Sequence, residues 1–359
     1  MLHRRIALFV PHQGCPKDCV FCNQSRITGQ KRENRLTEEQ VRRTIEEHRA
    51  TIPPDALVEI AYFGGSFTGL PRSYQRMLLE VAKEYIDAGV VQGIRFSTRP
   101  DYITDSIMEF LIQYGVTTIE LGTQSLDDTV LELSARGHSA AQVKKAVETI
   151  RKYPGIEVGL QLLPGLPGDS KELVMETVQK AISLQPDFVR IYPALVIAGT
   201  ELEWLFHTKQ YVPLTLEEAI DLVAGMWVEF MQADIPVIRM GLHSSEDLRT
   251  EGTIIAGPFH PSFRQLVEAK LYADLLDLVK QEVDPKEIKK VTLHPADETA
   301  LRGSKGGNWK GFVKQCSPNI PLLEFNSSLH RHMIEVSMRD GQVISYRLSA
   351  LADLESSFL

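Results

Sequence analysis

The chain alternates short apolar runs with longer stretches in which apolar residues recur at helical spacing. The apolar runs predict strands at residues 5–11, 57–63, 93–98, 118–122, 157–162, 187–191 and 237–241. Several of these runs are almost continuously apolar, which is typical of strands in a parallel sheet that is buried on both faces. The stretches between them predict helices at residues 37–50, 73–88, 104–114, 139–153, 170–184 and 215–233.

Three of the predicted helices begin with a sequence that suits a capping box. In each case a Ser or Thr precedes the helix and a Gln or Glu follows three residues later, the pairs being Thr37–Gln40, Ser139–Gln142 and Thr215–Glu218. Regular alternation of strands and helices predicts an α/β fold with right-handed βα connections, as a sheet or a barrel. In such folds the catalytic residues lie at the carboxyl ends of the strands.

The last part of the chain departs from this alternation. We expect a core barrel over residues 1–245, a helical connection over 246–285, and a small α+β domain over 286–359. That domain is predicted to hold a strand at 290–294, two short helical stretches, and strands near 322–325, 333–338 and 343–348. Asp340 and Gly341 mark a hairpin turn between the last two strands.

Composition and charge narrow the range of functions. The chain has 359 residues, of which 43% are hydrophobic, so a large core can form without disulfides. The formal net charge of −8 argues against a surface coated in basic residues for non-specific nucleic-acid binding, while leaving room for a local basic patch. No segment has the features of a signal peptide or the length of a membrane span, so we expect a cytoplasmic protein.

Three cysteines lie close together directly after the first predicted strand. Cys15, Cys19 and Cys22 have the spacing C-x3-C-x2-C, and the remaining cysteine, Cys316, is far away in the chain. Thiolates are soft ligands that suit iron–sulfur clusters and zinc. A structural zinc site would need a fourth ligand, for which His12 and Cys316 are candidates, although neither has a familiar zinc spacing. A disulfide is disfavoured, because four cysteines in a chain of this length do not make a secreted scaffold.

The spacing C-x3-C-x2-C resembles the signature of the radical S-adenosylmethionine (SAM) superfamily. The resemblance implies a 4Fe–4S cluster that is held by Cys15, Cys19 and Cys22 and has one iron left open. In that family the open iron chelates SAM, and an electron from the cluster cleaves SAM to methionine and a 5′-deoxyadenosyl radical that abstracts hydrogen from the substrate. An electron donor such as ferredoxin or flavodoxin is implied as a partner.

Motifs at the ends of the later predicted strands make the resemblance more specific. They lie at residues 62–67, 96–101, 120–125, 134–138, 163–168 and 191–202. Their order and residue identities resemble those of the radical SAM domain of the catalytic subunit of Elongator, which modifies wobble uridines in tRNA. More distantly, they resemble those of the oxygen-independent coproporphyrinogen oxidases. The similarity runs over residues 5–245 and implies a partial (βα)6-type, TIM-like radical SAM barrel.

The resemblance assigns SAM contacts to several residues. Gly64 and Gly65 match a turn whose backbone binds the amino group of SAM, because glycines let the backbone approach a ligand closely. Ser66 stands where a Glu is common, so this contact is expected to come mainly from the backbone. Arg136 matches an arginine that grips the SAM carboxylate, a task that suits the fork of a guanidinium.

Further SAM contacts are implied at the ends of the third, fourth and fifth strands. Gln124 and Gln161 match positions that contact the ribose hydroxyls or nearby atoms, and structural amides are the alternative. Thr98 belongs to a matching Thr-Arg-Pro-Asp run. Ser97 stands where the Elongator-like pattern has a Glu, which puts the usual ribose or adenosine contact from this strand in doubt.

The small C-terminal domain resembles a KH domain, which binds RNA. Gly303 and Gly306 form a G-x-x-G loop between two predicted short helices, and such a loop clamps the backbone of a single-stranded nucleic acid. Lys305 and Lys310 would supply charge to the phosphates. An ordinary glycine-containing helical turn is the alternative.

We therefore expect a radical SAM enzyme that modifies RNA, most plausibly tRNA. Arg190 and Tyr192 on the sixth strand are candidates to face the substrate, and no residue is assigned a catalytic role. Nothing in the chain resembles an acetyl-CoA loop, so acetyl-CoA chemistry is not assumed. Two alternatives stay open: a radical SAM enzyme that acts on a small metabolite, and a metal-stabilised RNA-binding adaptor without catalysis.

Overall fold

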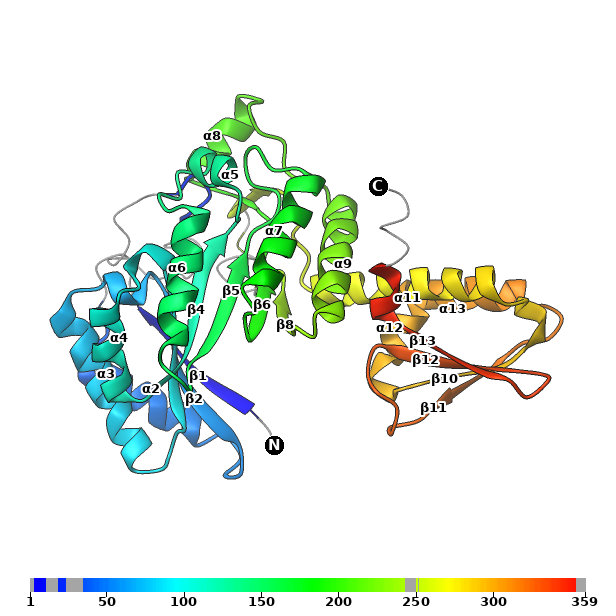
Figure 1. Ribbon diagram of the computed structural model, residues 1–359, viewed down its shortest axis with the longest axis horizontal. Coiled ribbons are helices and arrows are strands. Elements are labelled where there is room, and N and C mark those ends of the chain that lie inside the picture. Colours follow the sequence, from blue (N-terminus) through cyan, green and yellow to red (C-terminus); the bar gives the residue numbers. More distant parts are fainter. Residues whose placement is uncertain (1–2, 11–18, 24–34, 243–249, 251, 353–359) are drawn as a thin grey trace. The chain divides into compact units, whose positions relative to one another are not determined.

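The computed structural model describes residues 3–10, 19–23, 35–242, 250 and 252–352 (Figure 1). The chain divides into two compact units, and each is described by itself. The first unit is Met1–Leu214 with Leu242–Phe259, and the second is Thr215–Gly241 with His260–Leu359. In the described part of the chain, no helix is long and apolar enough to cross a membrane.

In the first unit, strands β1 to β6 lie side by side in the order in which they occur along the chain, and all are parallel. Their bounds are β1 (His3–Val10), β2 (Leu57–Gly64), β3 (Gly93–Thr98), β4 (Val116–Gln124), β5 (Glu157–Leu162) and β6 (Phe188–Ile191). The helices of this region are α2 (Glu38–Arg49), α3 (Arg72–Asp87), α4 (Asp105–Leu111), α5 (Asp128–Leu133), α6 (Ala140–Arg151) and α7 (Lys171–Ser183). The predicted βα alternation is confirmed.

The helices cover one face of this sheet, which we call the outer face (Figure 1). Alternate side chains of a strand point to opposite faces, and Ile6, Leu8 and Val10 of β1 are buried on the outer face. Tyr62 of β2 lies on the same face, where its hydroxyl donates to the carbonyl of Leu78 in α3 at 2.6 Å. Burial of these side chains against the helices fixes which face of each strand turns inward.

The opposite, inner face is polar, and the sheet curls around it. The guanidinium carbon of Arg190 in β6 lies 5.6 Å from the ring centroid of Phe63 in β2. Four strand spacings of about 4.8 Å separate these strands, so in a flat sheet they would be about 19 Å apart. The contact requires the sheet to curl into part of a barrel, which confirms the predicted TIM-like architecture.

Short elements in the first unit escaped the sequence prediction. Strand β7 (Val196–Ile197) pairs antiparallel with β9 (Ile254–Ala256), and α8 (Glu201–His207) follows β7. Helix α5 was also missed. These elements have seven residues or fewer, too few to display a hydrophobic period.

The second unit combines two long helices with a small sheet. Its first elements are α9 (Leu216–Gln232), β8 (Val237–Met240) and α11 (Phe263–Glu282). Next come β10 (Ile288–Leu293), α12 (Glu298–Arg302), α13 (Gly307–Gln315), β11 (Leu322–Phe325), β12 (Met333–Met338) and β13 (Val343–Arg347). The sheet order is β11-β10-β12-β13, with β11 parallel to β10 and the other pairs antiparallel. The predicted α+β character of this region is confirmed, and its order β10, α12, α13, β11 is the one expected for the KH-like resemblance.

Candidate functional site

Two of the three clustered cysteines lie on a tight turn in the first unit. The amide of Cys22 donates to the carbonyl of Cys19 at 2.9 Å, which closes the turn. Two backbone hydrogen bonds join the intervening Val20 to the rest of the unit: its amide donates to Ser134 O at 3.2 Å, and its carbonyl accepts from the amide of Leu202 at 2.7 Å. Cys15 lies outside the described residues. The turn therefore holds Cys19 and Cys22 at a fixed place relative to the segments after α5 and β7.

Apolar packing adds to these hydrogen bonds. Val20 is buried in a cluster with Val196, Leu202 and Tyr211, and Phe21 packs against the same cluster. Phe21 also packs against a second cluster that contains Val130, Leu166 and Ala194. Both residues between Cys19 and Cys22 are thus anchored by apolar packing, in which neither cysteine takes part.

Arg136 lies beside the cysteine turn. Its Nη1 donates to Cys19 Sγ at 3.5 Å, and its Nη2 donates to the carbonyl of Gly122 at 2.7 Å. The residue is only 7% exposed, and its Nε has no hydrogen-bond partner among the described residues. Among the residues that the structure describes, no carboxylate forms an ion pair with it. A buried guanidinium without a counter-ion is costly, so this position suits a bound anion such as a carboxylate.

Gly122 makes this position of Arg136 possible. A Cβ on Gly122 would lie 2.7 Å from Arg136 Nη2, which is closer than packed atoms allow. Two residues later, Gln124 has a left-handed backbone with φ of 68°, which is uncommon for a residue with a side chain. Strained backbone of this kind persists only where the surrounding structure holds it in place, and it is found mainly at functional sites. The end of β4 therefore has the features of a built binding site.

The glycine pair at the end of β2 meets the end of β1. Gly64 has φ of 110°, and a Cβ there would lie 2.5 Å from Val10 O. The amide of Gly65 donates to the same carbonyl at 3.4 Å. A residue with a side chain at Gly64 would disrupt this approach, so the backbone is the part of the turn that is available to a ligand.

The hydroxyls of Ser66 and Thr98 hold neighbouring strand ends together. The two oxygens are 2.8 Å apart, and Ser66 Oγ also accepts from the amide of Arg99 at 3.0 Å. Thr68 Oγ1 lies 2.5 Å from Thr98 Oγ1. All three hydroxyl side chains are buried. Their hydrogen bonds join the ends of β2 and β3, which keeps the glycine turn in place.

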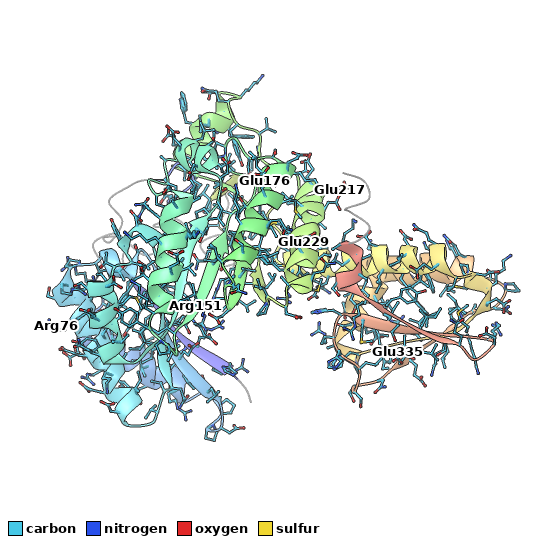
Figure 2. The ribbon with its side chains drawn as sticks, viewed as in Figure 1. Arg76, Arg151, Glu176, Glu217, Glu229 and Glu335 are labelled. Carbon is cyan, nitrogen blue, oxygen red and sulfur yellow. The ribbon has the colours of Figure 1, made fainter. Side chains whose placement is uncertain are left out.

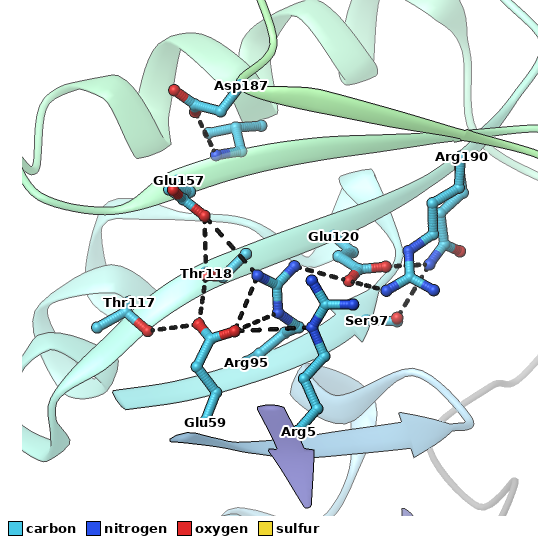
Figure 3. A network of polar contacts seen from close by, with 12 residues as sticks. Arg5, Glu59, Arg95, Ser97, Thr117, Thr118, Glu120, Glu157, Asp187 and Arg190 are labelled. Carbon is cyan, nitrogen blue, oxygen red and sulfur yellow. Dashed lines mark hydrogen bonds and ion pairs between the residues drawn. The ribbon is translucent and has the colours of Figure 1, made fainter. Parts of the chain in front are cut away.

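A network of buried charges occupies the inner face (Figure 3). Glu120 Oε1 accepts from Arg95 Nη1 at 3.0 Å and from Arg190 Nη2 at 2.8 Å. The side chain of Glu120 is fully buried, and those of the two arginines are 4% and 8% exposed. Other charged side chains, such as Glu176, lie on the exposed surface (Figure 2). These buried charges stabilise the fold only as a group, because removing one would leave an uncompensated charge in the protein interior.

Gln161 belongs to the same network. Its Nε2 donates to Glu120 Oε2 at 2.8 Å and to Ser97 Oγ at 3.0 Å. The structure therefore places this predicted SAM contact on the inner face with its amide nitrogen bonded to protein groups. The serine that replaces the expected Glu at position 97 is the partner that accepts one of these bonds.

The two candidate substrate residues of the sixth strand also lie on the inner face. Arg190 Nη1 donates to the hydroxyl of Tyr192 at 3.1 Å, so Tyr192 is linked to Glu120 through the arginine. Sequence reasoning assigned no role to Glu120 or Arg95. The signal that would have found them is a charged residue inside an otherwise apolar strand, since such a charge needs a partner on a neighbouring strand.

His138 lies buried near Arg136 and stays neutral. Burial, aided by the charges of Arg136 and Arg99, lowers the pKa of His138 from 6.5 to about 3. Its Nε2 donates to the carbonyl of Thr123 at 3.2 Å, while Nδ1 has no hydrogen-bond partner within the residues that the structure describes. A lowered pKa in the folded state means that the unfolded chain binds more protons below pH 6.5. This histidine therefore contributes stability that is present above pH 6.5 and is lost as the pH falls toward 3.

We expect His138→Gln to flatten the pH dependence of stability. The glutamine amide can still donate to Thr123 O, but it does not titrate. Urea unfolding at pH 7.5 and pH 5 should show that the native sequence loses more free energy of unfolding between these values than the variant does. Equal losses in the two proteins would contradict the assignment of a neutral, buried His138.

The predicted G-x-x-G loop lies in the second unit, between α12 and α13. Gly303 and Gly306 have φ of 68° and 76°, and Lys305 has a left-handed φ of 50°. Lys305 and Lys310 are exposed, and Lys310 Nζ donates to Lys305 O at 3.0 Å. The neighbouring Arg302 pairs with Glu298 at 2.7 Å. Lys305 of the loop and Lys310 of α13 are thus exposed beside a tight glycine backbone.

The described residues alone do not contain a complete metal site. Within them, no three His, Cys, Asp or Glu side chains are grouped so as to hold a metal ion. Of the predicted ligand set, Cys19 and Cys22 are described and Cys15 is not. The described contact between the predicted ligand Cys19 and the predicted SAM contact Arg136 is the hydrogen bond from Arg136 Nη1 to Cys19 Sγ.

Comparison with protein families gives two adjacent matches. Residues 9–181 match the radical SAM superfamily, and residues 186–273 match the radical SAM C-terminal domain. Together these ranges contain the end of β1 and all of β2 to β6, and they extend into α11. The cysteine turn, Arg136 and the inner-face network all lie within the matched residues.

Individual relatives agree with the family match. The chain is 30% identical over 225 residues to a tRNA uridine(34) acetyltransferase of Methanocaldococcus infernus, covering 55% of this chain and 42% of the relative. It is 28% identical over 320 residues to Elongator complex protein 3 of Schizosaccharomyces pombe, covering 79% and 56%. The chain thus spans about half the length of these relatives.

A solved structure has the same fold. The archaeal Elp3 of Methanocaldococcus infernus with an N-terminal deletion (1–46) matches with a TM-score of 0.61 and 22% identity, covering 80% of this chain and 70% of that chain. At this identity the match establishes the shared architecture, and the chemistry has to be argued from the residues.

Proposed function

Because the chain belongs to the radical SAM superfamily, a family of enzymes, we propose that it cleaves SAM reductively in order to modify RNA, with tRNA as the substrate class. The observation that carries this proposal is the buried Arg136, which contacts Cys19 and forms no ion pair with a carboxylate of the described residues. An arginine in this state provides a site for a carboxylate beside the cysteine turn. A structural zinc site would not need such a cation.

Three groups of residues would hold the cofactors. Cys19 and Cys22, together with Cys15, would bind a 4Fe–4S cluster, which supplies the electron that splits SAM and so generates the hydrogen-abstracting radical. Arg136 would bind the carboxylate of SAM, and the backbone at Gly64 and Gly65 would accept from its amino group. An external electron donor, such as ferredoxin or flavodoxin, would reduce the cluster.

RNA as the substrate is supported by two independent features. Named relatives are tRNA uridine(34) acetyltransferases and Elongator complex protein 3. In the second unit, Lys305 of the loop between α12 and α13 and Lys310 of α13 are exposed beside two glycines with positive φ. Backbone amides and lysines of such a loop suit contacts with phosphates.

The proposal is tested by measuring 5′-deoxyadenosine. The full chain is reconstituted with iron and sulfide under anaerobic conditions, reduced, and given SAM with and without bulk tRNA. Product that rises with tRNA is the expected result. Product that does not respond to tRNA would favour a small-metabolite substrate, and protein that binds zinc without iron and yields no product would favour a non-catalytic adaptor.

We expect Gly306→Asp to weaken RNA binding. The new carboxylate would sit near Lys310, whose Cε is 3.4 Å from an added Cβ, and would repel phosphates. Binding of tRNA by the native sequence should fall steeply with salt, because phosphate contacts release counterions. Filter binding at several salt concentrations should show a reduced affinity and a shallower salt slope for the variant.

Gly89→Asp is the matched control for this variant. Gly89 has φ of 69°, close to the 76° of Gly306, and nothing lies within 4 Å of an added Cβ. It adds the same charge and a similar backbone strain in the first unit. If Gly306→Asp binds RNA as tightly as the native sequence, the loop is not part of the RNA-binding site.

A further inference from the structure

An aromatic pair lies on the inner face at the carboxyl ends of β1 and β2. Phe9 and Phe63 are direct neighbours in the parallel register. Alternation along β1 puts Phe9 on the same face as Arg5, which pairs with Glu59 of the inner-face network. The pair therefore lies on the inner face, one residue before Val10 and Gly64, whose backbones meet at the glycine turn.

Phe9 is exposed although its strand neighbours are buried. Its relative exposure is 44%, whereas Leu8 and Val10 are 2% and 3% exposed. Phe9 takes no part in packing the outer face, so core packing on that face does not explain a large aromatic ring at this position. An exposed aromatic ring inside a curled sheet offers a flat apolar surface to a ligand.

Arg190 and Tyr192 add a polar side to this pair. The guanidinium of Arg190 lies over the ring of Phe63 at 5.6 Å, and Arg190 Nη1 donates to the hydroxyl of Tyr192 at 3.1 Å. Since Tyr192 accepts this bond, its own O–H can be donated to a ligand. Among the described residues, no hydrogen bond uses this proton. Arg190 Nε is buried and has no hydrogen-bond partner in the described part of the chain.

The charge of the surroundings indicates the kind of ligand. Arg190 is compensated by the fully buried Glu120, so this part of the inner face is not an unpaired cationic site for a phosphate. The groups that face a ligand here are then a flat aromatic surface, the hydroxyl donor of Tyr192 and the N–H of Arg190 Nε. This combination suits an uncharged, planar heterocycle that carries a carbonyl, such as an unstacked pyrimidine base.

We propose that Phe9 and Phe63 form a stacking platform for the target base of the RNA, with Tyr192 donating a hydrogen bond to a base carbonyl. The inference rests on the proposed function, because it requires an RNA substrate whose base leaves its stack. Its position agrees with the rule that sites in βα barrels lie at the carboxyl ends of the strands. In this assignment Arg190 and Glu120 are positioning residues, because they orient Tyr192.

The platform is tested with a fluorescent base. An anticodon stem-loop with an emissive pyrimidine analogue at the wobble position is titrated with the cluster-loaded full chain, under anaerobic conditions and without reductant. Stacking on an aromatic ring should quench the analogue on binding. Phe9→Leu keeps an apolar side chain but removes the ring, so it should abolish most of the quench and weaken binding of the stem-loop about tenfold.

Two further variants make the result specific. Phe9→Trp restores an aromatic surface and should restore the quench. Phe325→Leu removes a comparably exposed phenylalanine, 40% against 44%, from β11 in the second unit, and should leave the quench unchanged. If Phe9→Leu destabilises the fold, its thermal unfolding midpoint will be lowered. Phe63→Leu removes the other ring of the platform and should also reduce the quench.

The failures of the two proposals are distinguishable. If the native sequence binds and quenches the analogue, and Phe9→Leu does so equally well, the platform is wrong while RNA binding stands. The platform is also wrong if the native sequence binds the stem-loop without any quench. If the native sequence does not bind the stem-loop at all, the proposed RNA substrate fails, and the platform fails with it.

Discussion

Replacing Cys22 with alanine is expected to abolish production of 5′-deoxyadenosine by the anaerobically reconstituted enzyme. The proposed cluster has three cysteine ligands in one short segment, and the remaining thiolates cannot replace the lost one at the same position. The turn that joins Cys19 and Cys22 is fixed by its 2.9 Å hydrogen bond and by the contacts of Val20, so a distant thiol cannot take over by a local shift. Iron and sulfide content, ultraviolet–visible absorption and product formation should all fall together.

Cys316→Ala is the matched control for this experiment. Cys316 is fully buried in the second unit, where its Sγ contacts the carbonyl of Phe312 at 3.4 Å. Loss of its thiol should reduce stability slightly and leave the iron content and product formation unchanged, because a buried Cys behaves as a small apolar residue. Full iron content and undiminished product in Cys22→Ala would refute the cluster assignment.

Glu120→Gln is expected to lower the free energy of unfolding by about 3–5 kcal/mol, the range found when one partner of a buried ion pair is removed. Glu120 is fully buried and accepts from both Arg95 and Arg190. The amide keeps the shape of the side chain but not its charge, so two buried guanidinium groups would share a weaker acceptor. Gln161, which also donates to Glu120, would lose the charge on its acceptor as well.

Urea unfolding followed by circular dichroism measures this loss. Glu176→Gln is the matched control, because Glu176 has a side chain that is 61% exposed and pairs with Lys180 one helical turn away. Exposed pairs of this kind contribute at most about 1 kcal/mol. If both variants lose the same small free energy of unfolding, the buried network on the inner face does not stabilise the barrel as we propose.

Effects of Glu120→Gln on function should follow from Arg190. This arginine joins Glu120 to Tyr192, and it lies over the ring of Phe63. A loosened Arg190 would leave Tyr192 without its fixed orientation. Stability and orientation of the proposed base platform therefore depend on the same buried carboxylate.

Features that depend on neighbouring residues in the sequence were predicted well. The capping boxes at Thr37, Ser139 and Thr215 are all present, each with both reciprocal hydrogen bonds. The strands β2, β3 and β5 lie within a residue of the expected bounds, because runs of buried apolar residues flanked by turns are local signals. The family resemblance likewise rests on short motifs whose spacing is visible along the chain.

The site itself depends on contacts that no local pattern contains. Arg136 and Cys19 are 117 positions apart, and their contact exists only because β1 and β4 end at the same edge of the sheet. The sequence offered Gln161 as a SAM contact, with a structural amide as the alternative, whereas its hydrogen bonds to Ser97 and Glu120 came from the tertiary structure.

The sequence by itself determined which long segments become strands and helices, where the three cysteines cluster, and to which family the motifs point, because these follow from the order and chemistry of adjacent residues. Only the tertiary structure decided how the inner face is filled. Curling of the sheet brings Arg190 of β6 onto Phe63 of β2, and this closure sets the partners of the buried charges and leaves Phe9 exposed. The physical reason is that burial and charge pairing depend on distances in space, which strand order and curvature fix and which sequence separation does not.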